Sequence, residues 1–345
     1  MERSVWVSRF EYQTREDISR IMRQCRDAGF RSVMFQVRAN GTTYFGSQRE
    51  PWSEQFGFRA PAFDPLSEAT RIAHANGLKI QAWVNVLPGW RADGPPSDPR
   101  QLYHTKPGWF LRTPTGEFAT EGNYLFLNPT IPEVRAYLAE LVGDIADDYP
   151  IDGIHLDYVR FPSGSASEQS PGDTESLARF TRETGRPLGD LAAFRAWKAG
   201  SVTDLVARVR RRLSQLPRRV VLTAAVNPDQ EKIKRDVLQD WPRWARERLV
   251  DAVFPMNYTP DPALFAQRSA ACVALARGTP VVMGIGVYKH QEARLGARST
   301  VRQMDAALNS GAAGVCLFSY GSALSGEWGP AVARWNRGHG GGPGR

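Results

Sequence analysis

The stretch DGIHLDYVRFP, residues 152–162, combines the apolar pattern of a strand with acidic, aromatic and basic side chains at its end. Alternate residues of a strand point to the same face, so His155 and Asp157 share one face. Ile154 and Leu156 occupy the other face, which we expect to pack against helices. This parity turns Asp157 towards a barrel interior, where it is either half of a structural ion pair or a catalytic carboxyl group.

Polar residues occupy similar positions at the ends of other predicted strands. Parity turns Gln36 and Arg38 inward, and it does the same for Asn85. After Pro255 the register is ambiguous, so either Asn257 or Tyr258 faces inward. His155 is expected to be a buried support for Asp157, with proton transfer as the alternative. The candidates for substrate contact or support are therefore Gln36, Arg38, Asn85, His155, Asn257 and Tyr258. The competing interpretation is an internal network in which Arg38 pairs with Asp157.

Eight apolar, strand-like segments alternate with amphipathic helical segments along the 345 residues. Such alternation predicts an α/β fold with a parallel sheet covered by helices, and the length favours closure into a (β/α)8 TIM barrel. A doubly wound open sheet is the alternative, but no G-x-G-x-x-G follows the first strand. We expect one domain over residues 1–337 and a disordered tail over 338–345. The strands are predicted at residues 4–8, 32–37, 79–86, 153–156, 220–226, 251–256, 280–287 and 314–319.

Three long loops, 39–63, 87–130 and 161–190, follow predicted strands and are rich in Gly, Pro and aromatic residues. Loops after barrel strands lie on the catalytic face, so we expect them to build a substrate cleft. Their aromatic side chains are candidate stacking surfaces for sugar rings, with loop core as the alternative role. These candidates are Trp52 and Trp90, followed by Tyr44, Trp109 and Tyr124.

The charge of the chain favours an acidic partner. The formal net charge is +8 and the pI is about 9.6, which suits an anionic polysaccharide, a cell wall, a membrane surface or a nucleic acid. The densest basic run, Arg208–Arg212, falls on a predicted amphipathic helix and is typical of a solvated helix face. No nucleic-acid-binding motif accompanies the charge, so we do not expect a nucleic-acid partner.

Histidine and cysteine spacing predicts neither a metal site nor a cofactor. The five histidines show no HxH or HxxxH pattern, and the three cysteines form no CxxC pair. No apolar stretch is long enough to span a membrane. No signal peptide is visible, so we expect a cytoplasmic protein unless a leader lies outside this chain.

Ordered motifs run through nearly the whole chain, from about Arg3 to Trp335. They are SVWVS near the start, FQVRANGTTYF (35–45), EPWSEQFG (50–57), FDPLSEATRIAHANGLKIQAWVNV (63–86), LNPTIPEVRAYL (127–138), DGIHLDYVRFP (152–162), QDWPRW (239–244) and PMNYT (255–259). In these motifs the chain resembles glycosyl-hydrolase-like family 10, relatives of bacterial family 10 glycosylhydrolases. The resemblance implies a TIM-barrel glycosidase and activity on bacterial cell-wall or exopolysaccharide glycans.

Two departures from related patterns constrain the mechanism. Many relatives carry paired aspartates where this chain has Asp157 and Tyr158, so only the first acid is retained. Chitinase-like barrels place an acid two residues beyond the last Asp of D-G-x-D-x-D-x-E, and that position is Val159 here. Substrate-assisted chitinase chemistry from this strand is therefore not expected.

Glycoside hydrolysis normally uses two carboxyl groups, roughly 5 Å apart for retention and roughly 6.5–9.5 Å apart for inversion. With Asp157 as the first, the candidates for the second are, in order, Asp229 (with Glu231 beside it), Asp240 and Glu50. Asp229 could instead form an Asx turn, and Asp240 could cap a helix. We thus expect an O-glycosyl hydrolase of a polymeric glycan. The alternatives are a non-catalytic carbohydrate-binding protein with the same cleft and, less favoured, a metal-dependent hydrolase or deacetylase.

Overall fold

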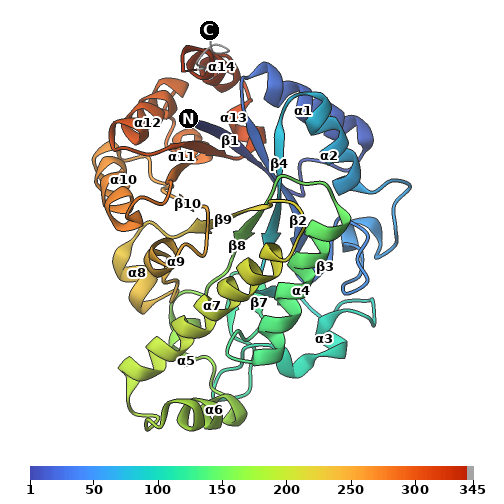
Figure 1. The fold of residues 1–345 in the computed structure, drawn as a ribbon, viewed down its shortest axis with the longest axis vertical. Helices are drawn as coiled ribbons and strands as arrows, with labels where there is room; N and C mark the ends of the chain where they lie inside the picture. The colour runs from blue at the N-terminus through green and yellow to red at the C-terminus, as the bar shows by residue number, and fades with distance from the viewer. Residues whose placement is uncertain (340–345) are drawn as a thin grey trace.

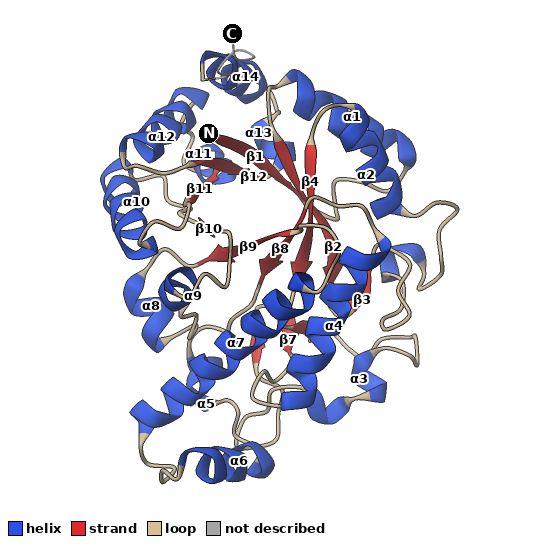
Figure 2. Ribbon diagram, viewed as in Figure 1, coloured by secondary structure: helices blue, strands red, loops and turns tan. Residues whose placement is uncertain are grey.

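Eight parallel strands form a barrel at the centre of the computed structural model, which describes residues 1–339 (Figures 1 and 2). Their order is β10-β9-β8-β4-β2-β1-β12-β11, and the bridges Val253–Val281 and Met256–Gly284 join β10 to β11 and close the ring. The predicted TIM barrel and its eight strands are confirmed. The strands are β1 (Glu2–Val7), β2 (Ser32–Ala39), β4 (Lys79–Asn85), β8 (Gly153–Asp157), β9 (Val221–Val226), β10 (Ala252–Pro255), β11 (Val282–Gly286) and β12 (Gly314–Phe318).

A helix follows each strand and covers the outside of the barrel (Figure 2). Local sequence sets where these helices begin: Thr14 and Asp17 form a capping box at the first, and Asp64 caps the second ahead of Pro65. The outer helices are α1 (Arg15–Asp27), α2 (Pro65–Ala75), α4 (Pro132–Asp148), α7 (Leu191–Ser214), α9 (Trp241–Arg246), α10 (Pro262–Ala276), α12 (Ala297–Asn309) and α14 (Trp328–Gly338). Three shorter helices each precede one of these: α8 (Gln230–Arg235) precedes α9, α11 (Val287–Glu292) precedes α12, and α13 (Tyr320–Ala323) precedes α14.

The three long loops carry secondary structure of their own. The first holds β3 (Thr42–Thr43) and η1 (Glu54–Phe56), and the third holds α5 (Ser165–Gln169) and α6 (Thr174–Thr184), which lie at the bottom of Figure 1. The middle loop forms a small antiparallel sheet in the order β5-β7-β6. Its elements are β5 (Pro88–Arg91), α3 (Leu102–Thr105), η2 (Pro107–Trp109), β6 (Thr120–Glu121) and β7 (Tyr124–Phe126).

The barrel has an inner and an outer core, as the parity of β8 predicts. Ile154 and Leu156 belong to the outer core between sheet and helices. The inner core is a separate cluster of Trp6, Met34, Trp83, Phe254, Val282 and Cys316. In the register of the sheet, Trp83 lies beside His155 and Asn85 lies beside Asp157. The polar ends of β4 and β8 are therefore neighbours at the mouth of the barrel.

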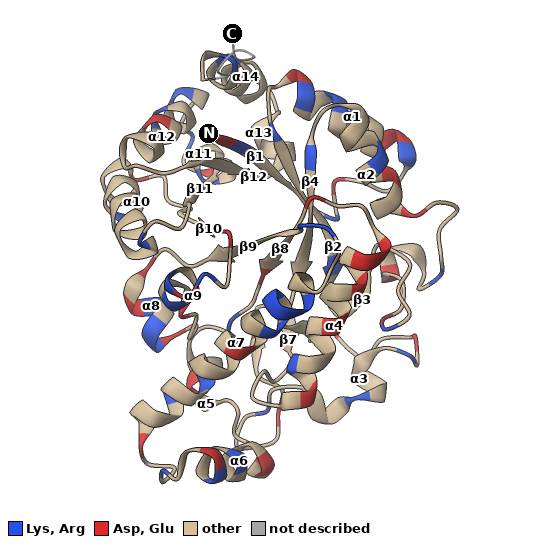
Figure 3. Cartoon of the chain, in the orientation of Figure 1, with Lys and Arg blue, Asp and Glu red and all other residues tan. Residues whose placement is uncertain are grey.

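Basic side chains are spread over the outer elements rather than gathered on one (Figure 3). The solvated face expected for Arg208–Arg212 holds only in part: Arg211 is exposed, while the other three arginines are half-buried and form ion pairs. Arg208 pairs with Asp204, Arg210 with Asp251, and Arg212 with Glu140 and Asp147 of α4. Of these pairs, only those of Arg212 join two helices, α7 and α4.

At the C-terminus, α14 runs to Gly338, the first residue of the predicted tail. Residues 340–345 lie outside the described residues, so the disorder expected there stays a prediction. Within residues 1–339, no helix combines the length and apolar character that crossing a membrane requires.

Gly153 lies where neighbouring strands approach closely at the bottom of β8. A Cβ there would lie 2.7 Å from the Val221 carbonyl oxygen and 3.1 Å from side-chain carbons of Gln81. We predict that Gly153→Ala lowers the free energy of unfolding by about 1–3 kcal/mol because backbone must shift. Gly200→Ala is the matched control: α7 has open space at that position, so stability should rise by up to about 1 kcal/mol. Urea unfolding measures both, and equal effects would contradict this packing.

Candidate active site

A cavity of about 490 Å³ opens at the C-terminal mouth of the barrel. Residues from the ends of five strands and from the loops after them line it. Four predicted site residues, Gln36, Asn85, Asp157 and Tyr258, share this cavity. The aromatic rings of Trp6, Trp83, Tyr124, Tyr288 and Phe318 form much of the rest of the wall.

Asp157 ends β8 and is only 6% exposed. Its Oδ1 accepts a hydrogen bond from the Tyr158 backbone N–H at 2.7 Å, and its Oδ2 accepts one from Trp83 Nε1 at 3.1 Å. Tyr158 adopts a left-handed backbone (φ +50°), which ends the strand. Burial raises the pKa of Asp157 to about 6, although these N–H groups and the charge of Arg160 act in the opposite direction. A carboxyl group with this pKa is suited to act as a general acid near neutral pH.

His155 is fully buried below Asp157, and both of its ring nitrogens are engaged. Trp6 Nε1 donates to Nε2 at 3.0 Å, and Nδ1 lies 2.8 Å from the Thr223 hydroxyl, which itself donates to Gln81. This network assigns the proton to Nδ1. Burial lowers the pKa of His155 to about 3, so the ring is neutral. His155 makes no hydrogen bond to Asp157 and has no free nitrogen for proton transfer, so it supports the barrel interior.

Arg38 and Glu50 form a buried ion pair outside the cavity. The register of β2 against β4 shifts between Gln36 and Arg38, and this irregularity reverses the side-chain direction. Arg38 donates to Glu50 through Nε at 2.8 Å and Nη2 at 2.6 Å, and both side chains are 0% exposed. The predicted inward orientation of Arg38 is therefore wrong, and it pairs with Glu50 rather than Asp157. Glu50 is likewise unavailable as a second catalytic carboxylate.

Asp229 and Asp240 cap short helices instead of facing Asp157. Asp229 begins α8 and also pairs with Arg268 at 3.1 Å. Burial would raise the pKa of Asp229, but the Lys232 N–H and the charge of Arg268 lower it below its usual value. Asp240 accepts from the Arg243 N–H at the start of α9 and lines a separate cavity of about 510 Å³. Neither residue lines the cavity of Asp157, and Glu231 is exposed beside Arg235.

The remaining candidates divide between packing and the cleft. Asn257 points away from the barrel and donates to the Phe265 carbonyl oxygen at 2.9 Å, which leaves Tyr258 as the inward residue. Trp52 packs against Phe56 and lines neither cavity of the barrel mouth. Trp90 is almost fully buried, but it contributes to the wall of a second cavity beside the first.

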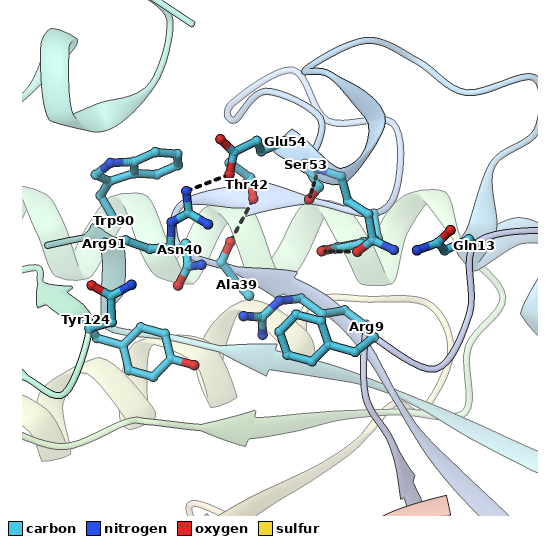
Figure 4. A pocket seen from close by; sticks show the side chains of 14 residues that line it. Arg9, Gln13, Ala39, Asn40, Thr42, Ser53, Glu54, Trp90, Arg91 and Tyr124 are labelled. Atoms are coloured by element: carbon cyan, nitrogen blue, oxygen red, sulfur yellow. Dashed lines mark hydrogen bonds and ion pairs between the residues drawn. The ribbon is translucent and has the colours of Figure 1, made fainter. Parts of the chain in front are cut away.

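This second cavity, drawn in Figure 4, has a volume of about 560 Å³. It adjoins the cavity of Asp157. The two share Arg9, Phe10 and Tyr124 as lining residues. Its other walls come from the loop after β2, from η1 and from β5. The two cavities together form a cleft that continues from Asp157 across the long loops, as the loop positions predict.

Three arginines of the cleft, Arg9, Arg91 and Arg160, were not among the predicted substrate contacts. Arg160 reaches the cavity of Asp157 while Glu121 holds it through two contacts of 2.7 and 3.1 Å. Arg9 lies two residues beyond the end of β1. A polar residue just after a barrel strand is a candidate for the site, so this position could have identified Arg9 from the sequence. Glu121 lies within the long middle loop, and no sequence pattern singled it out.

The sequence of the chain matches the family model described as glycosyl hydrolase-like 10 over residues 2–293. The chain belongs to this family. Relatives include glycosyl hydrolase DigH of Escherichia coli K12, 26% identical over 298 residues, and glycosyl hydrolase YngK of Bacillus subtilis 168, 22% identical over 264 residues. These matches cover 76% and 71% of this chain but only 63% and 49% of the relatives.

Solved structures show the same fold. The glycoside hydrolase domain of PgaB (BpsB) from Bordetella bronchiseptica has a TM-score of 0.73 at 18% identity, covering 96% of this chain and 98% of that domain. Alpha-L-fucosidase isoenzyme 2 from Paenibacillus thiaminolyticus has a TM-score of 0.68 at 13% identity, covering 98% of this chain and 49% of that one. In the described part of the chain, no three His, Cys, Asp or Glu side chains gather as a metal site would require.

The raised pKa of Asp157 has a consequence for stability. Its usual value is 3.8 and the folded value is about 6, so ionisation penalises the native state progressively between about pH 4 and 6. The full cost above pH 6 is about 3 kcal/mol. We predict that Asp157→Asn gains stability relative to the wild type as pH rises from 3 to 8, whatever constant offset it shows at pH 3. Urea unfolding at both pH values tests this, and a pH-independent difference would contradict it.

The Arg38–Glu50 pair should matter for folding and not for ligand contact. Arg38→Met leaves Glu50 charged and buried, so we predict a loss of about 3–5 kcal/mol in the free energy of unfolding. The double variant Arg38→Met, Glu50→Leu removes both charges and should recover much of that loss. Denaturant unfolding of the two variants gives the comparison. A single variant as stable as wild type would contradict the buried pairing.

Proposed function

We propose that this protein is a glycoside hydrolase that cleaves a polymeric glycan of the bacterial cell wall or of an exopolysaccharide, with Asp157 as its essential carboxyl group. The observation that carries the proposal is a buried carboxyl group of raised pKa at the floor of an aromatic-lined cavity in a TIM barrel. Membership of the glycosyl hydrolase-like 10 family and relatives named glycosyl hydrolases support it. The cytoplasmic location expected from the sequence stays a prediction.

In this mechanism the protonated Asp157 donates to the glycosidic oxygen as the bond to the leaving sugar breaks. The Tyr158 N–H and Trp83 Nε1–H then stabilise the carboxylate that remains. Asn85 lies beside Asp157 in the sheet, and its buried Oδ1 has no partner within residues 1–339. A buried amide oxygen without a partner is costly, so we assign it to a sugar hydroxyl of the substrate.

A second protein carboxylate does not line the cavity within residues 1–339. Glu121 lies near it but is held by Arg160 and by the Ser163 N–H. Two-carboxylate hydrolysis needs a second group at a defined distance from the first. With Asp157 as the acid, the attacking group therefore comes from water or from the glycan itself.

The same observation favours the alternative function, a carbohydrate-binding protein that uses this cleft without turnover. Binding needs the aromatic walls, Asn85 and the arginines, and it needs no second carboxylate. The two functions differ in whether bound glycan is shortened.

A screen of cell-wall and exopolysaccharide glycans, read by new reducing ends, tests the proposal. We predict that Asp157→Asn lowers kcat/KM by about 100-fold or more while glycan affinity is retained. Because the protonated acid is required, wild-type kcat/KM should fall as pH rises above about 6. Asp240→Asn is the matched control, since that carboxylate caps α9 outside the cleft.

Two results would overturn parts of this proposal. Hydrolysis by Asp157→Asn at the wild-type rate would remove Asp157 from the mechanism. Binding of a glycan without cleavage by the wild type at any pH between 4 and 8 would favour the carbohydrate-binding alternative.

A further inference from the structure

Arg9 is a buried cation without an anionic partner in the described chain. It is 8% exposed, and within residues 1–339 it forms no ion pair. Its Nη1 donates to Gln36 Oε1 at a long 3.4 Å, and its backbone N–H donates to the same oxygen at 3.0 Å. A guanidinium group has five N–H donors, and within residues 1–339 only Nη1 of Arg9 makes a side-chain hydrogen bond. The unbonded nitrogens are not among the fully buried polar atoms, so they are open to the cavity. Most of its donor capacity is therefore unused.

The other two arginines of the cleft differ from Arg9 in this respect. Arg91 pairs with Glu54 at 2.7 Å and with Asp93 at 3.3 Å. Arg160 pairs with Glu121 through both terminal nitrogens. Their charges are balanced by the protein itself. Among the cationic side chains that line the two cavities, Arg9 is the one whose charge the residues of 1–339 leave unbalanced.

The position of Arg9 places it in the path of a ligand that spans the cleft. Arg9 lines both cavities, and Figure 4 shows its guanidinium pointing into the space between Asn40 and Tyr124. Phe10 also lines both cavities and is 72% exposed, with its ring centroid 4.2 Å from Arg9 Cζ. An exposed aromatic ring beside a buried cation offers an apolar surface for a sugar face next to donors for an anion.

We propose that Arg9 binds a carboxylate carried by the glycan, so that the substrate is an acidic polysaccharide. A guanidinium and a carboxylate form two parallel hydrogen bonds in one plane, and one such pair balances the single charge of Arg9. The acidic sugar would lie on Phe10, where the two cavities meet, next to the sugar unit that lies over Asp157. This inference rests on the proposed function and names the substrate class of that same cleft.

The test measures binding in the Asp157→Asn background, where turnover does not interfere. The probes are oligosaccharides of alginate, polygalacturonate and hyaluronate, and the glycan found by the hydrolysis screen if it carries carboxylates. Each is used native and with its carboxyl groups reduced to alcohols, which removes the charge and keeps the sugar. We expect at least one native form to bind about tenfold more tightly than its reduced form. Arg9→Met should abolish this difference, and Arg9→Lys should retain part of it.

Arg59→Met is the control for net charge, because Arg59 is exposed and lines neither cavity. It should keep the preference for the native form. Equal binding of native and reduced forms, a preference unaffected by Arg9→Met, or no binding of any acidic probe would contradict the inference. So would an Arg9-dependent preference for dextran sulfate or dextran phosphate over every carboxylated probe, which would assign the site to another anion. If one of these results is found but the protein still cleaves a neutral glycan through Asp157, only the inference about Arg9 fails and the proposed function stands. If the protein neither binds nor cleaves any glycan, both the inference and the proposed function are contradicted.

Discussion

The burial of one carboxyl group at the end of β8 is the constraint on which the site depends. Asp157 is held away from water and receives two N–H donors, one from the backbone of Tyr158 and one from the ring of Trp83. Burial outweighs these donors and raises the pKa of the group to about 6. The same desolvation that makes ionisation unfavourable in the folded state retains the proton that the proposed mechanism uses. Stability and reactivity are thus set by one environment.

The layer beneath Asp157 fixes that environment. Trp6, His155, Thr223 and Gln81 form a continuous hydrogen-bonded chain across the barrel interior. A buried polar network is stable only when its members are satisfied, and here each link has a partner. This chain connects the side chains of four strands, β1, β4, β8 and β9, inside the barrel. The neutral His155 is part of this floor, and Asp157, the proposed acid, lies one layer above it.

The barrel and the face of Asp157 could be predicted because both follow from periodicity. Strand–helix alternation repeated eight times, and two-residue parity placed Asp157 in the mouth and Ile154 in the outer core. The inward orientation of Arg38 could not be predicted, since an irregularity between Gln36 and Arg38 reverses parity without a visible signal. Whether a second carboxylate lies near Asp157 could not be predicted from the sequence either. Asp229 and Asp240 have the same sequence features whether they cap helices or face a substrate, and only the fold shows that they cap.

The loops explain why the cleft is larger than the barrel mouth. The small sheet of β5, β6 and β7 supplies Arg91 and Tyr124 beside Arg9 and extends the wall away from Asp157. The proposed reaction at Asp157 and the proposed recognition along this extension use different parts of one surface. The most direct test of the central claim is a titration of the Asp157 carboxyl carbon by ¹³C NMR, assigned by its loss in Asp157→Asn. A midpoint near 6 is the expected result. A midpoint at or below the usual 3.8 would show that the group is ionised throughout the neutral range and would contradict its role as the acid.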